Sequence, residues 1–431
     1  MDKLRNVFPF YKRKDEKEES LSSHFCQNGS LLLKELIACF GGRYELPIRS
    51  FTAGELIRAT NNFSEQVNHI ALDDWKFFRG NLQDRPILVK FGEVGREFPR
   101  ITEFVIREIV VNSQMGHPKN VSHLIGCCLE FELPAVVYAY APGMESLTHS
   151  LSYPRNSKLL SWKSRIKIAS DIANVLLYLH TAFPSPIIFR DLKLARVILD
   201  NSGVAKLVGF MVQSHGRGRG RGLERSTSVS AYRSRLGVTR PSQSVAVTTR
   251  LISRRVKYFG IVSSRYRIGR GRDGDDSAES SRSRPRLRTM VGFDLSISLP
   301  PGEKKVEDEI CGTFGYVDPE YVKSCFVTEK SDVYSLGVFI LLLISGETSV
   351  LKDDELTVAY VKRRFENDPL KHILDPKSFE EEGYNEHEIE QHLLPFTNLA
   401  LRCTEEKGED RPDMIEVAKQ LRQIEKSLHN Y

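Results

Sequence analysis

Residues 187–200 read IIFRDLKLARVILD, and this stretch decides the fold. Five of its residues are charged, namely Arg190, Asp191, Lys193, Arg196 and Asp200, and most of the others are apolar. Five further motifs surround the stretch in a fixed order: PILVK and REIVVNSQMGH upstream, and CGTFGYVDPEY, KSDVYSLGV and EDRP downstream. The interpretation therefore depends on an ordered set of motifs and not on one short match.

These motifs resemble the signature of protein kinases, whose catalytic loop usually reads His-Arg-Asp-x-Lys-x-x-Asn. In that resemblance Asp191 and Lys193 are the catalytic-loop pair. Lys90 is the lysine that binds phosphates, and Glu108 is its helix partner. Strands first and helices afterwards predict two unlike lobes. We therefore expect an α+β, bilobal protein kinase-like fold, with an antiparallel sheet plus a helix in the N-lobe and a mainly helical C-lobe.

The same resemblance assigns structural roles in the helical lobe. Glu320 and Arg411 resemble its buried salt bridge, and Asp332 resembles the carboxylate that ties the catalytic loop to the central helix. Lys90 and Glu108 are expected to join a strand to a helix, either as a structural pair or with residual nucleotide contact. These roles hold a fold together without requiring catalysis.

The nucleotide cleft keeps some family positions and loses others. Tyr138 stands at the gatekeeper position, and Ala139 and Tyr140 form the hinge, so the sequence is compatible with an adenine-shaped cleft. The glycine loop of the family lets bare backbone amides approach the phosphates. The aligned stretch HIALDDWKFFRG instead places Asp73 and Asp74 where glycines are expected. ATP binding is therefore doubtful.

The magnesium ligands are replaced as well. Where the family has Asp-Phe-Gly, the chain has Gly209-Phe210-Met211, or Gly292-Phe293-Asp294 if a later register is used. Arg196 stands in place of the catalytic-loop asparagine, and Phe189 in place of its histidine. A missing metal removes several kcal/mol of transition-state stabilisation. We predict no metal site, no required cofactor, and vestigial roles for Asp191 and Lys193.

Composition and motif positions divide the chain into five segments. They are an N-terminal tail with a short amphipathic helix (1–50), the N-lobe (51–140), the first part of the C-lobe (141–210), a basic insertion (211–290) and the second part of the C-lobe (291–431). Residues 1–25 are charged and Ser-rich, which predicts a mobile tail. In the stretch NGSLLLKELIACFGG that follows, Leu32, Leu33, Leu36 and Ile37 recur at helical spacing.

Short apolar stretches from Trp75 to Val89 predict strands, with turns expected at Gly80-Asn81 and at Asp84-Arg85-Pro86. The longest apolar run, Val338 to Ile344, falls far short of the roughly 20 residues that cross a bilayer, so it predicts a buried helix. No transmembrane segment or signal peptide is expected. The predicted location is cytoplasmic, with recruitment to the plasma membrane through partners.

The segment 211–290 holds 19 Lys/Arg against 5 Asp/Glu, so its excess positive charge exceeds the +6 of the whole chain. It is rich in Arg, Ser and Gly, which predicts disorder. Val208-Gly209-Phe210 recurs as Val291-Gly292-Phe293, which suggests a late insertion. The GRGRGRG tract resembles RNA-binding Arg-Gly tracts, but solvated disorder is the expected reading, and no DNA partner is predicted.

The run FTAGELIRATNNFSE, followed by the kinase motifs, resembles plant receptor-like kinases of the wall-associated-kinase-like branch. The upstream NGSLLLKELIACFGG, with LPIRSF and the lost glycines, is similar to a narrower group: receptor-like cytoplasmic pseudokinases that serve as adaptors of a coiled-coil NLR immune receptor. That resemblance implies docking on the leucine-rich repeats of the receptor. It also implies recruitment of receptor-like cytoplasmic kinases modified by a bacterial effector. The implied docking surface includes the segment from Leu32 to Ile37 and the small lobe.

Three functions remain open at this point. The first is a pseudokinase adaptor in plant innate immunity. The second is a weakly active serine/threonine kinase that uses Lys90 and Asp191 with an unusual metal site. The third gives the basic insertion an RNA-binding role. The sequence leaves open whether the chain is an enzyme, and it does not name the effector, the kinase or the receptor.

Overall fold

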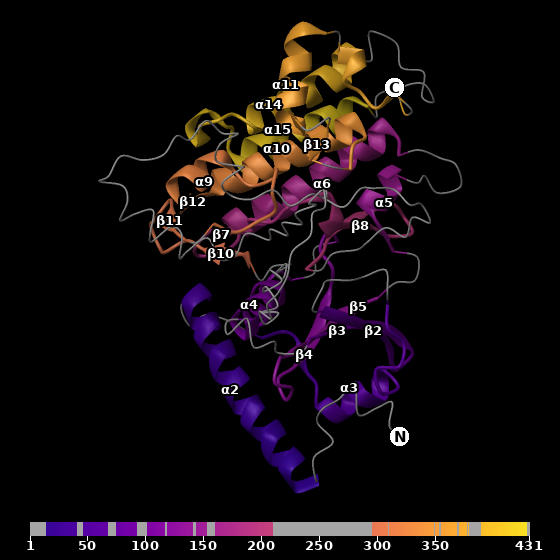
Figure 1. The fold of residues 1–431 in the computed structure, drawn as a ribbon, viewed down its shortest axis with the longest axis vertical. Helices are drawn as coiled ribbons and strands as arrows, with labels where there is room; N and C mark the ends of the chain where they lie inside the picture. Colours follow the sequence, from indigo (N-terminus) through magenta and orange to yellow (C-terminus); the bar gives the residue numbers. More distant parts are fainter. Residues whose placement is uncertain are drawn as a thin grey trace, which may run out of the picture.

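The computed structural model describes residues 14–40, 46–67, 75–92, 101–116, 119–140, 144–152, 160–209, 295–308, 310–348 and 389–428, and most of 350–378. These residues form two lobes, which Figure 1 shows with the sheet and the helices α2, α3 and α4 in one lobe and the remaining helices in the other. The expected bilobal α+β kinase fold is confirmed. The basic segment 211–290 lies outside the described residues.

The N-lobe is built on one five-stranded sheet. Its strands are β1 (Arg49–Ser50), β2 (Trp75–Leu82), β3 (Arg85–Gly92), β4 (Leu124–Cys128) and β5 (Ala135–Ala139), in the order β1-β4-β5-β3-β2. All neighbours are antiparallel except β1 and β4, which are parallel. A Cβ on Gly126 would lie 2.0 Å from the Arg49 carbonyl oxygen, so this close pairing requires glycine.

The first predicted turn in this region is wrong. Gly80 and Asn81 lie inside β2, and the chain turns at Gln83 and Asp84, whose φ angles are +51° and +63°. Gly80 serves close packing instead, because a Cβ there would lie 2.8 Å from the Ala59 carbonyl oxygen. A glycine that admits neighbouring backbone looks the same in sequence as a glycine that turns the chain.

The two faces of the sheet carry different helices. Ile87, Val89 and Phe91 of β3 pack in the cluster beneath α3 (Ala53–Ala59), which begins at a capping box formed by Thr52 and Glu55. The alternate residues Leu88 and Lys90 face the other side, toward α4 (Ile101–Gln114). Because side chains alternate along a strand, Lys90 is placed on the face that α4 covers.

The N-terminal helix is longer than predicted. The helix α2 runs from Lys14 to Phe40, over 27 residues, so the tail expected over residues 1–25 is wrong from Lys14 onward. Residues 1–13 lie outside the described part of the chain. The run KDEKEES consists mostly of Lys and Glu, which have high helix propensity and extend the helix without needing an apolar face.

Helix α2 is fastened along α4 (Figure 1). Leu32 and Leu36 are buried against the lobe, whereas Leu33 and Ile37 are exposed. The buried amide of Asn28 donates to the carbonyl oxygens of Leu129 and Phe131 at 2.9 and 2.8 Å.

The C-lobe is mainly helical, as expected. Its helices are α5 (Leu147–Ser152), α6 (Trp162–Thr181), α9 (Pro319–Ser324), α10 (Glu329–Ser345), α11 (Thr357–Asn367), α14 (Leu394–Cys403) and α15 (Met414–Ser427), with short turns at Leu194–Arg196, Leu370–His372, Ile389–Leu393 and Gly408–Asp410. Its short strands are β6 (Glu145–Ser146), β7 (Ile187–Ile188), β8 (Val197–Leu199), β9 (Ala205–Leu207), β10 (Ile297–Ser298), β11 (Val306–Glu307), β12 (Phe326–Val327), β13 (Leu351–Lys352) and β14 (Glu355–Leu356).

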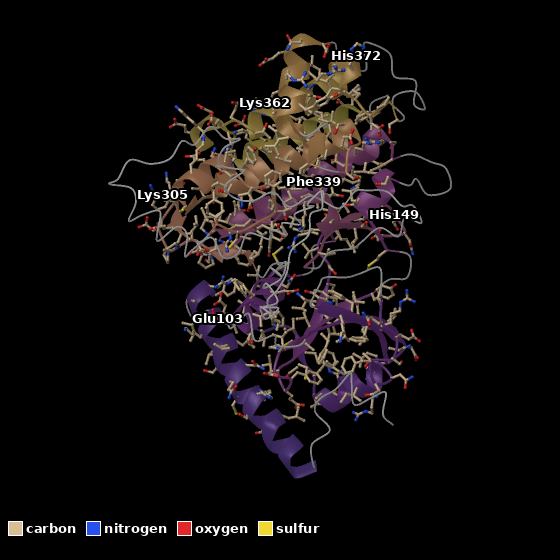
Figure 2. The ribbon with its side chains drawn as sticks, in the orientation of Figure 1. Glu103, His149, Lys305, Phe339, Lys362 and His372 are labelled. Atoms are coloured by element: carbon tan, nitrogen blue, oxygen red, sulfur yellow. The ribbon has the colours of Figure 1, made fainter. Side chains whose placement is uncertain are left out.

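Helix α10 forms the centre of this lobe. Every residue from Val338 to Ile344 is 0% exposed, which confirms the predicted buried helix. Figure 2 shows Phe339 within the stack of helices, with Lys305 and His372 at its periphery. Among the described helices, none combines the length and the hydropathy that a bilayer crossing requires.

Candidate active site and its replacement contacts

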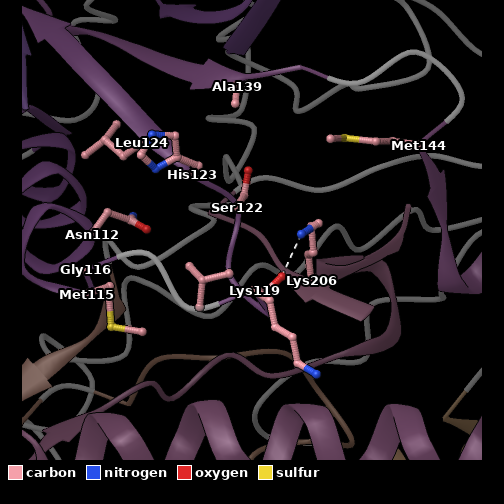
Figure 3. Close-up of a pocket in the computed structure, with 11 residues that line it drawn as sticks. Asn112, Met115, Gly116, Lys119, Ser122, His123, Leu124, Ala139, Met144 and Lys206 are labelled. Atoms are coloured by element: carbon pink, nitrogen blue, oxygen red, sulfur yellow. Dashed lines mark hydrogen bonds between the residues drawn. The ribbon is translucent and has the colours of Figure 1, made fainter. Parts of the chain in front are cut away.

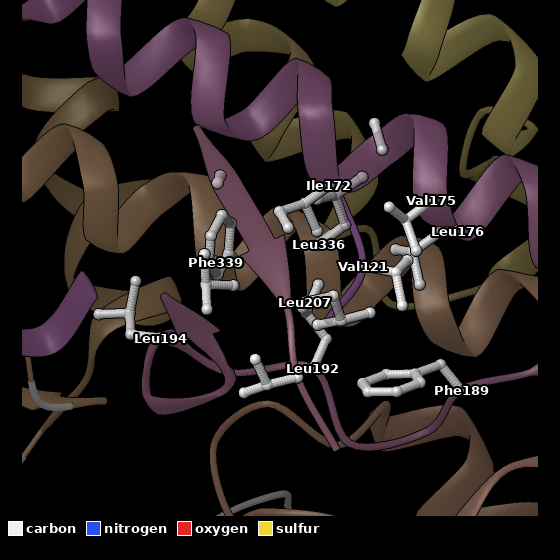
Figure 4. Close-up of a cluster of buried hydrophobic side chains, with 14 of the residues drawn as sticks. Val121, Ile172, Val175, Leu176, Phe189, Leu192, Leu194, Leu207, Leu336 and Phe339 are labelled. Atoms are coloured by element: carbon white, nitrogen blue, oxygen red, sulfur yellow. The ribbon is translucent and has the colours of Figure 1, made fainter. Parts of the chain in front are cut away.

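Apolar packing against the C-lobe fixes the catalytic loop. Phe189, Leu192 and Leu194 point into a cluster with Leu207 and Phe339, and Figure 4 shows them converging there. Phe189 takes the place of the family histidine and is 0% exposed, so its ring adds to this core. The charged residues that alternate with these anchors are thereby held in one arrangement.

Asp332 ties the loop to α10, as the sequence predicts. One of its carboxylate oxygens accepts from the Phe189 backbone N–H at 2.7 Å, and the other from Arg190 at 2.8 Å. Arg190 has a φ of +69°, a left-handed conformation that costs a non-glycine residue about 1 kcal/mol or more. The two hydrogen bonds to Asp332 offset that cost.

Asp191 is surrounded by donors and is only 1% exposed. Arg196 donates to one carboxylate oxygen through Nε at 2.8 Å and through a second nitrogen. Thr313 donates its hydroxyl to the other oxygen at 2.5 Å, and Lys193 Nζ lies 3.8 Å away and donates to Thr313 at 2.8 Å. Both oxygens are therefore occupied by groups of the chain itself.

Burial alone would raise the pKa of the Asp191 carboxyl, but the charges of Arg196 and Lys193 and the hydrogen bonds from Thr313 and Arg196 hold that pKa below its usual range. A proton acceptor at neutral pH works best with a pKa near 7. The surroundings of Asp191 move its pKa in the opposite direction. The carboxylate is thus set up as a permanent anion within an ion pair.

Arg196 is itself fully buried, at 0% exposed. Its guanidinium lies 5.9 Å from the centre of the Phe189 ring and pairs with Asp191. Its Nη1 has no hydrogen-bond partner among the described residues. The two family substitutions, phenylalanine for histidine and arginine for asparagine, are therefore in contact and complement each other.

Lys90, Glu108 and Tyr138 form a second closed cluster, and all three are 0% exposed. Lys90 Nζ donates to Glu108 Oε2 at 2.5 Å, and the Tyr138 hydroxyl donates to Glu108 Oε1. The strand-to-helix pair expected from the sequence is present. The gatekeeper tyrosine is an additional member of this cluster that sequence reasoning did not place there.

Gly209 lies buried against the same cluster. A Cβ at this position would lie 2.7 Å from Glu108 Oε1 and 2.8 Å from the Tyr138 hydroxyl, closer than real contacts allow. The family places its metal-binding aspartate here in one of the two registers. With Tyr138 as it stands, an aspartate would not fit without a shift. The alternative register, Gly292-Phe293-Asp294, lies outside the described residues.

The hinge is held by neighbouring backbone. The Ala139 N–H donates to the His123 carbonyl at 2.9 Å, and the Tyr140 N–H donates to the Pro86 carbonyl at 3.2 Å. Arg79 donates to the Tyr140 hydroxyl at 2.9 Å. The glycine-loop positions Asp73 and Asp74 are outside the described residues, so the adenine-shaped cleft stays a prediction.

The prediction that Arg411 forms a salt bridge with Glu320 is wrong. Arg411 instead makes a bidentate pair with Asp318, through two bonds of 2.8 Å. Asp318 is the N-cap of α9, and its carboxylate matches the planar fork of a guanidinium. Glu320, two residues further on, accepts from the Gly408 backbone N–H. Arg411 therefore keeps its structural role with a different carboxylate.

Arg190 links the catalytic loop to the segment that follows the insertion. It donates to the Leu295 carbonyl at 2.5 Å and pairs with Asp308 at 2.6 Å. In kinases this kind of contact is often made to a phosphorylated residue. Here the unmodified carboxylate of Asp308 makes the contact with Arg190.

The sequence of the chain is similar to those of several known proteins. The family described as protein tyrosine and serine/threonine kinase matches residues 66–222. The chain is 32% identical to serine/threonine-protein kinase ZRK1 of Arabidopsis thaliana, over 94% of this chain and 93% of that protein. It is 30% identical to the non-functional pseudokinase ZED1 of the same plant, over 93% of this chain and 96% of that protein. It is also 30% identical to wall-associated receptor kinase-like 1, over 94% of this chain but 43% of that longer protein.

Proposed function

Since the chain belongs to the protein kinase family, in the branch that includes these Arabidopsis kinases and pseudokinases, we propose that it is a catalytically inactive, kinase-like adaptor. The main support is the closed contact between Arg196 and Asp191. Asp191 would have to receive a substrate hydroxyl in an active kinase. Its oxygens instead accept hydrogen bonds from Arg196 and Thr313, so a substrate hydroxyl would have to compete with these donors.

The cleft, we infer, works without Mg²⁺ and without ATP. Arg196 places a fixed cation where the family has an amide ligand, and residue 209 supplies no carboxylate. A cation next to a metal site opposes metal binding, and the two lost ligands are the ones that would bridge the metal to the phosphates.

The binding role is supported by one face of α2. Leu33 and Ile37 are 49% and 51% exposed, and they lie four residues apart along the helix. Residues with this spacing share one face, so the two side chains form an apolar stripe that the lobe does not cover. We define this stripe as the α2 face. An uncovered apolar stripe on a helix is typical of a partner-binding surface.

The partner proposed for the α2 face is the leucine-rich repeat domain of a coiled-coil NLR immune receptor. A receptor-like cytoplasmic kinase altered by a bacterial effector is the proposed second partner, bound at the segment between Leu295 and Ser324. Arg190 holds part of that segment in place through Leu295 and Asp308. We place this adaptor in the cytoplasm of a plant cell and propose that its partners bring it to the plasma membrane.

Two measurements on the purified full-length chain test this proposal. Incubation with labelled ATP, Mg²⁺ and a generic protein substrate should give no label transfer above the Asp191→Asn variant. Calorimetric titration with the isolated leucine-rich repeat domain of the receptor should show saturable binding. Label transfer that Asp191→Asn abolishes would contradict the inactive assignment, and absence of binding would contradict the adaptor role.

A weakly active serine/threonine kinase is the second candidate. It is favoured by the intact pair between Lys90 and Glu108 and by the contact from Lys193 to Thr313. This candidate predicts that ATP with Mg²⁺ raises the melting temperature of the chain, and that Lys90→Met removes the rise. A melting temperature unchanged by millimolar ATP and Mg²⁺ argues against it.

A further inference from the structure

Helix α2 of the N-lobe also touches the C-lobe. Its last residue, Phe40, is 5% exposed, and its ring centre lies 5.6 Å from that of Phe183, which follows α6. Phe183 in turn makes an edge-on contact with Tyr178 of α6, again with ring centres 5.6 Å apart. Figure 1 shows the corresponding end of α2 directed at the C-lobe. A chain of aromatic contacts therefore joins a helix of one lobe to a helix of the other.

The same helix is attached to its own lobe along the turns that precede Phe40. Leu32 and Leu36 are buried in one apolar cluster with the residues of α4. Between them, Glu35 pairs with Arg107 of α4 at 2.7 Å. Because these contacts hold α2 against α4, Phe40 moves together with the N-lobe.

A second connection between the lobes lies beside the hinge. The Ser122 N–H donates to the Leu207 carbonyl at 2.9 Å, which holds the segment after α4 to β9 of the C-lobe. Lys206 of β9 donates to the Lys119 carbonyl at 2.6 Å, drawn as a dashed line in Figure 3. Ala139 of the hinge lines the same small cavity as Ser122 and Lys206. This connection is therefore close to the pivot of any rotation between the lobes.

The two connections differ in their distance from that pivot. When lobes rotate about a hinge, contacts beside the hinge change little, whereas contacts far from it must separate. Figure 1 shows the end of α2 on the side of the molecule away from α5, the first helix after the hinge. The contact between Phe40 and Phe183 is therefore placed where it resists rotation, and the contact between Ser122 and Leu207 is not.

We propose that α2 is a brace between the lobes: while Phe40 packs on Phe183 the lobes keep one orientation, and release of this contact frees them to rotate about the hinge. The brace is independent of the proposed adaptor function, because it needs neither a partner nor the Asp191 network. One regulatory consequence does rest on that function. Ile37 of the α2 face lies one helical turn before Phe40, so a protein bound to this face is placed to strengthen or release the contact.

Distances between two spin labels test the brace in the full-length chain without any partner. The labels replace Glu103 at the start of α4 and Lys305 of the C-lobe, which are exposed and lie on the α2 side of the molecule (Figure 2). They are attached through unnatural amino acids, because the native Cys26 is exposed and would also react. Phe183→Ala should raise the share of long label distances roughly twofold to tenfold, the value of one aromatic pair. Phe40→Ala should do the same, and the double variant should have no larger effect than either single change.

Tyr178→Ala is the matched control. It removes an aromatic neighbour of Phe183 within the C-lobe and leaves Phe40 in place, so its label distances should match those of the unaltered chain. Phe183 is only partly buried, and its truncation should leave a cooperative unfolding transition in urea. Unchanged label distances in either Phe40→Ala or Phe183→Ala would overturn the proposal. An equal widening in Tyr178→Ala would also overturn it, because the effect would then not come from the contact between the lobes.

Discussion

The hydroxyl of Tyr138 lies 2.8 Å from the position that a Cβ on residue 209 would occupy. The same hydroxyl donates to Glu108, whose other carboxylate oxygen accepts from Lys90. The two substitutions therefore depend on each other, because the Tyr138 hydroxyl takes space that a side chain at residue 209 would need. Restoring a single residue does not restore the family arrangement.

Gly209→Ala should lower the free energy of unfolding by about 1–3 kcal/mol, because the new methyl group is forced against Glu108 and Tyr138. Tyr138→Phe removes one of the two clashing atoms, so the double variant should be more stable than the sum of the single effects predicts. Urea unfolding followed by fluorescence measures all three variants.

Gly29→Ala is the matched control for this prediction. A Cβ on Gly29 in α2 meets no atom within 4 Å, so this variant should gain roughly 0.5–1 kcal/mol from helix propensity. Strictly additive effects of Gly209→Ala and Tyr138→Phe would show that the two positions are not coupled.

Arg196→Asn restores the family amide and should still give no phosphotransfer, because residue 209 continues to lack a carboxylate. It should destabilise the chain by about 3–5 kcal/mol, since removing one partner leaves a buried charge on Asp191. Thermal and urea unfolding measure the loss. Arg402→Ala breaks the exposed pair with Glu416 and should cost about 1 kcal/mol or less. Similar costs for the two variants would contradict the buried-pair interpretation.

The lowered pKa of Asp191 predicts a particular pH dependence of stability. A carboxyl whose folded pKa lies below its unfolded value of about 3.9 stabilises the fold above that pH. The stabilisation should fade as the pH falls below about 4 and vanish once the pH passes the folded pKa. The difference in unfolding free energy between the unaltered chain and Asp191→Asn should therefore be constant from pH 6 to 8 and narrow in acid. A gap that widens below pH 4 would mean that Asp191 is not held as an anion.

Leu33→Asp and Ile37→Asp test the α2 face as a docking surface. Both side chains are half exposed, so each change should alter unfolding by roughly 0.5 kcal/mol or less. Binding to the leucine-rich repeat domain should weaken at least tenfold, because a charge would be buried against an apolar partner. Ile415→Asp alters an equally exposed apolar residue on α15 and should leave binding unchanged. Leu36→Asp would unfold the small lobe and is not a fair test.

Deletion of residues 211–293, which keeps one copy of Val-Gly-Phe, should leave the fold intact. Loop-closure entropy grows slowly with length, so the shorter chain should gain up to about 3 kcal/mol of stability. Circular dichroism and urea unfolding compare the two forms. Loss of the cooperative transition on deletion would show that the insertion contributes to folding.

Much of the architecture could be predicted, because each of the kinase motifs occurs with one particular backbone geometry. Asp332 and the loop from Phe189 to Lys193 follow such a motif, and the contact to Arg190 lies where it was expected. The buried helix from Val338 to Ile344 follows from apolar content alone. Patterns that specify one local geometry are readable from sequence.

Contacts between distant residues could not be predicted in the same way. Nothing in the spacing shows that Arg411 selects Asp318 over Glu320, because the two acids lie only two residues apart at the start of α9. The contact between Gly209 and Tyr138 joins residues about 70 positions apart, and its only signal was that a bulky gatekeeper accompanied a glycine. The N-terminal half of α2 was missed because a helix of Lys and Glu lacks an apolar period.

Two polar contacts hold helix α2 against its lobe. Asn28 donates a hydrogen bond to the loop after β4, and Glu35 forms a salt bridge with Arg107 of α4 at 2.7 Å. A protein that binds the outer side of α2 therefore binds a helix that is held against the small lobe, and not a flexible segment. A displacement of α2 caused by such a partner would be transmitted directly to α4, and so to the carboxylate of Glu108, without passing through the cleft.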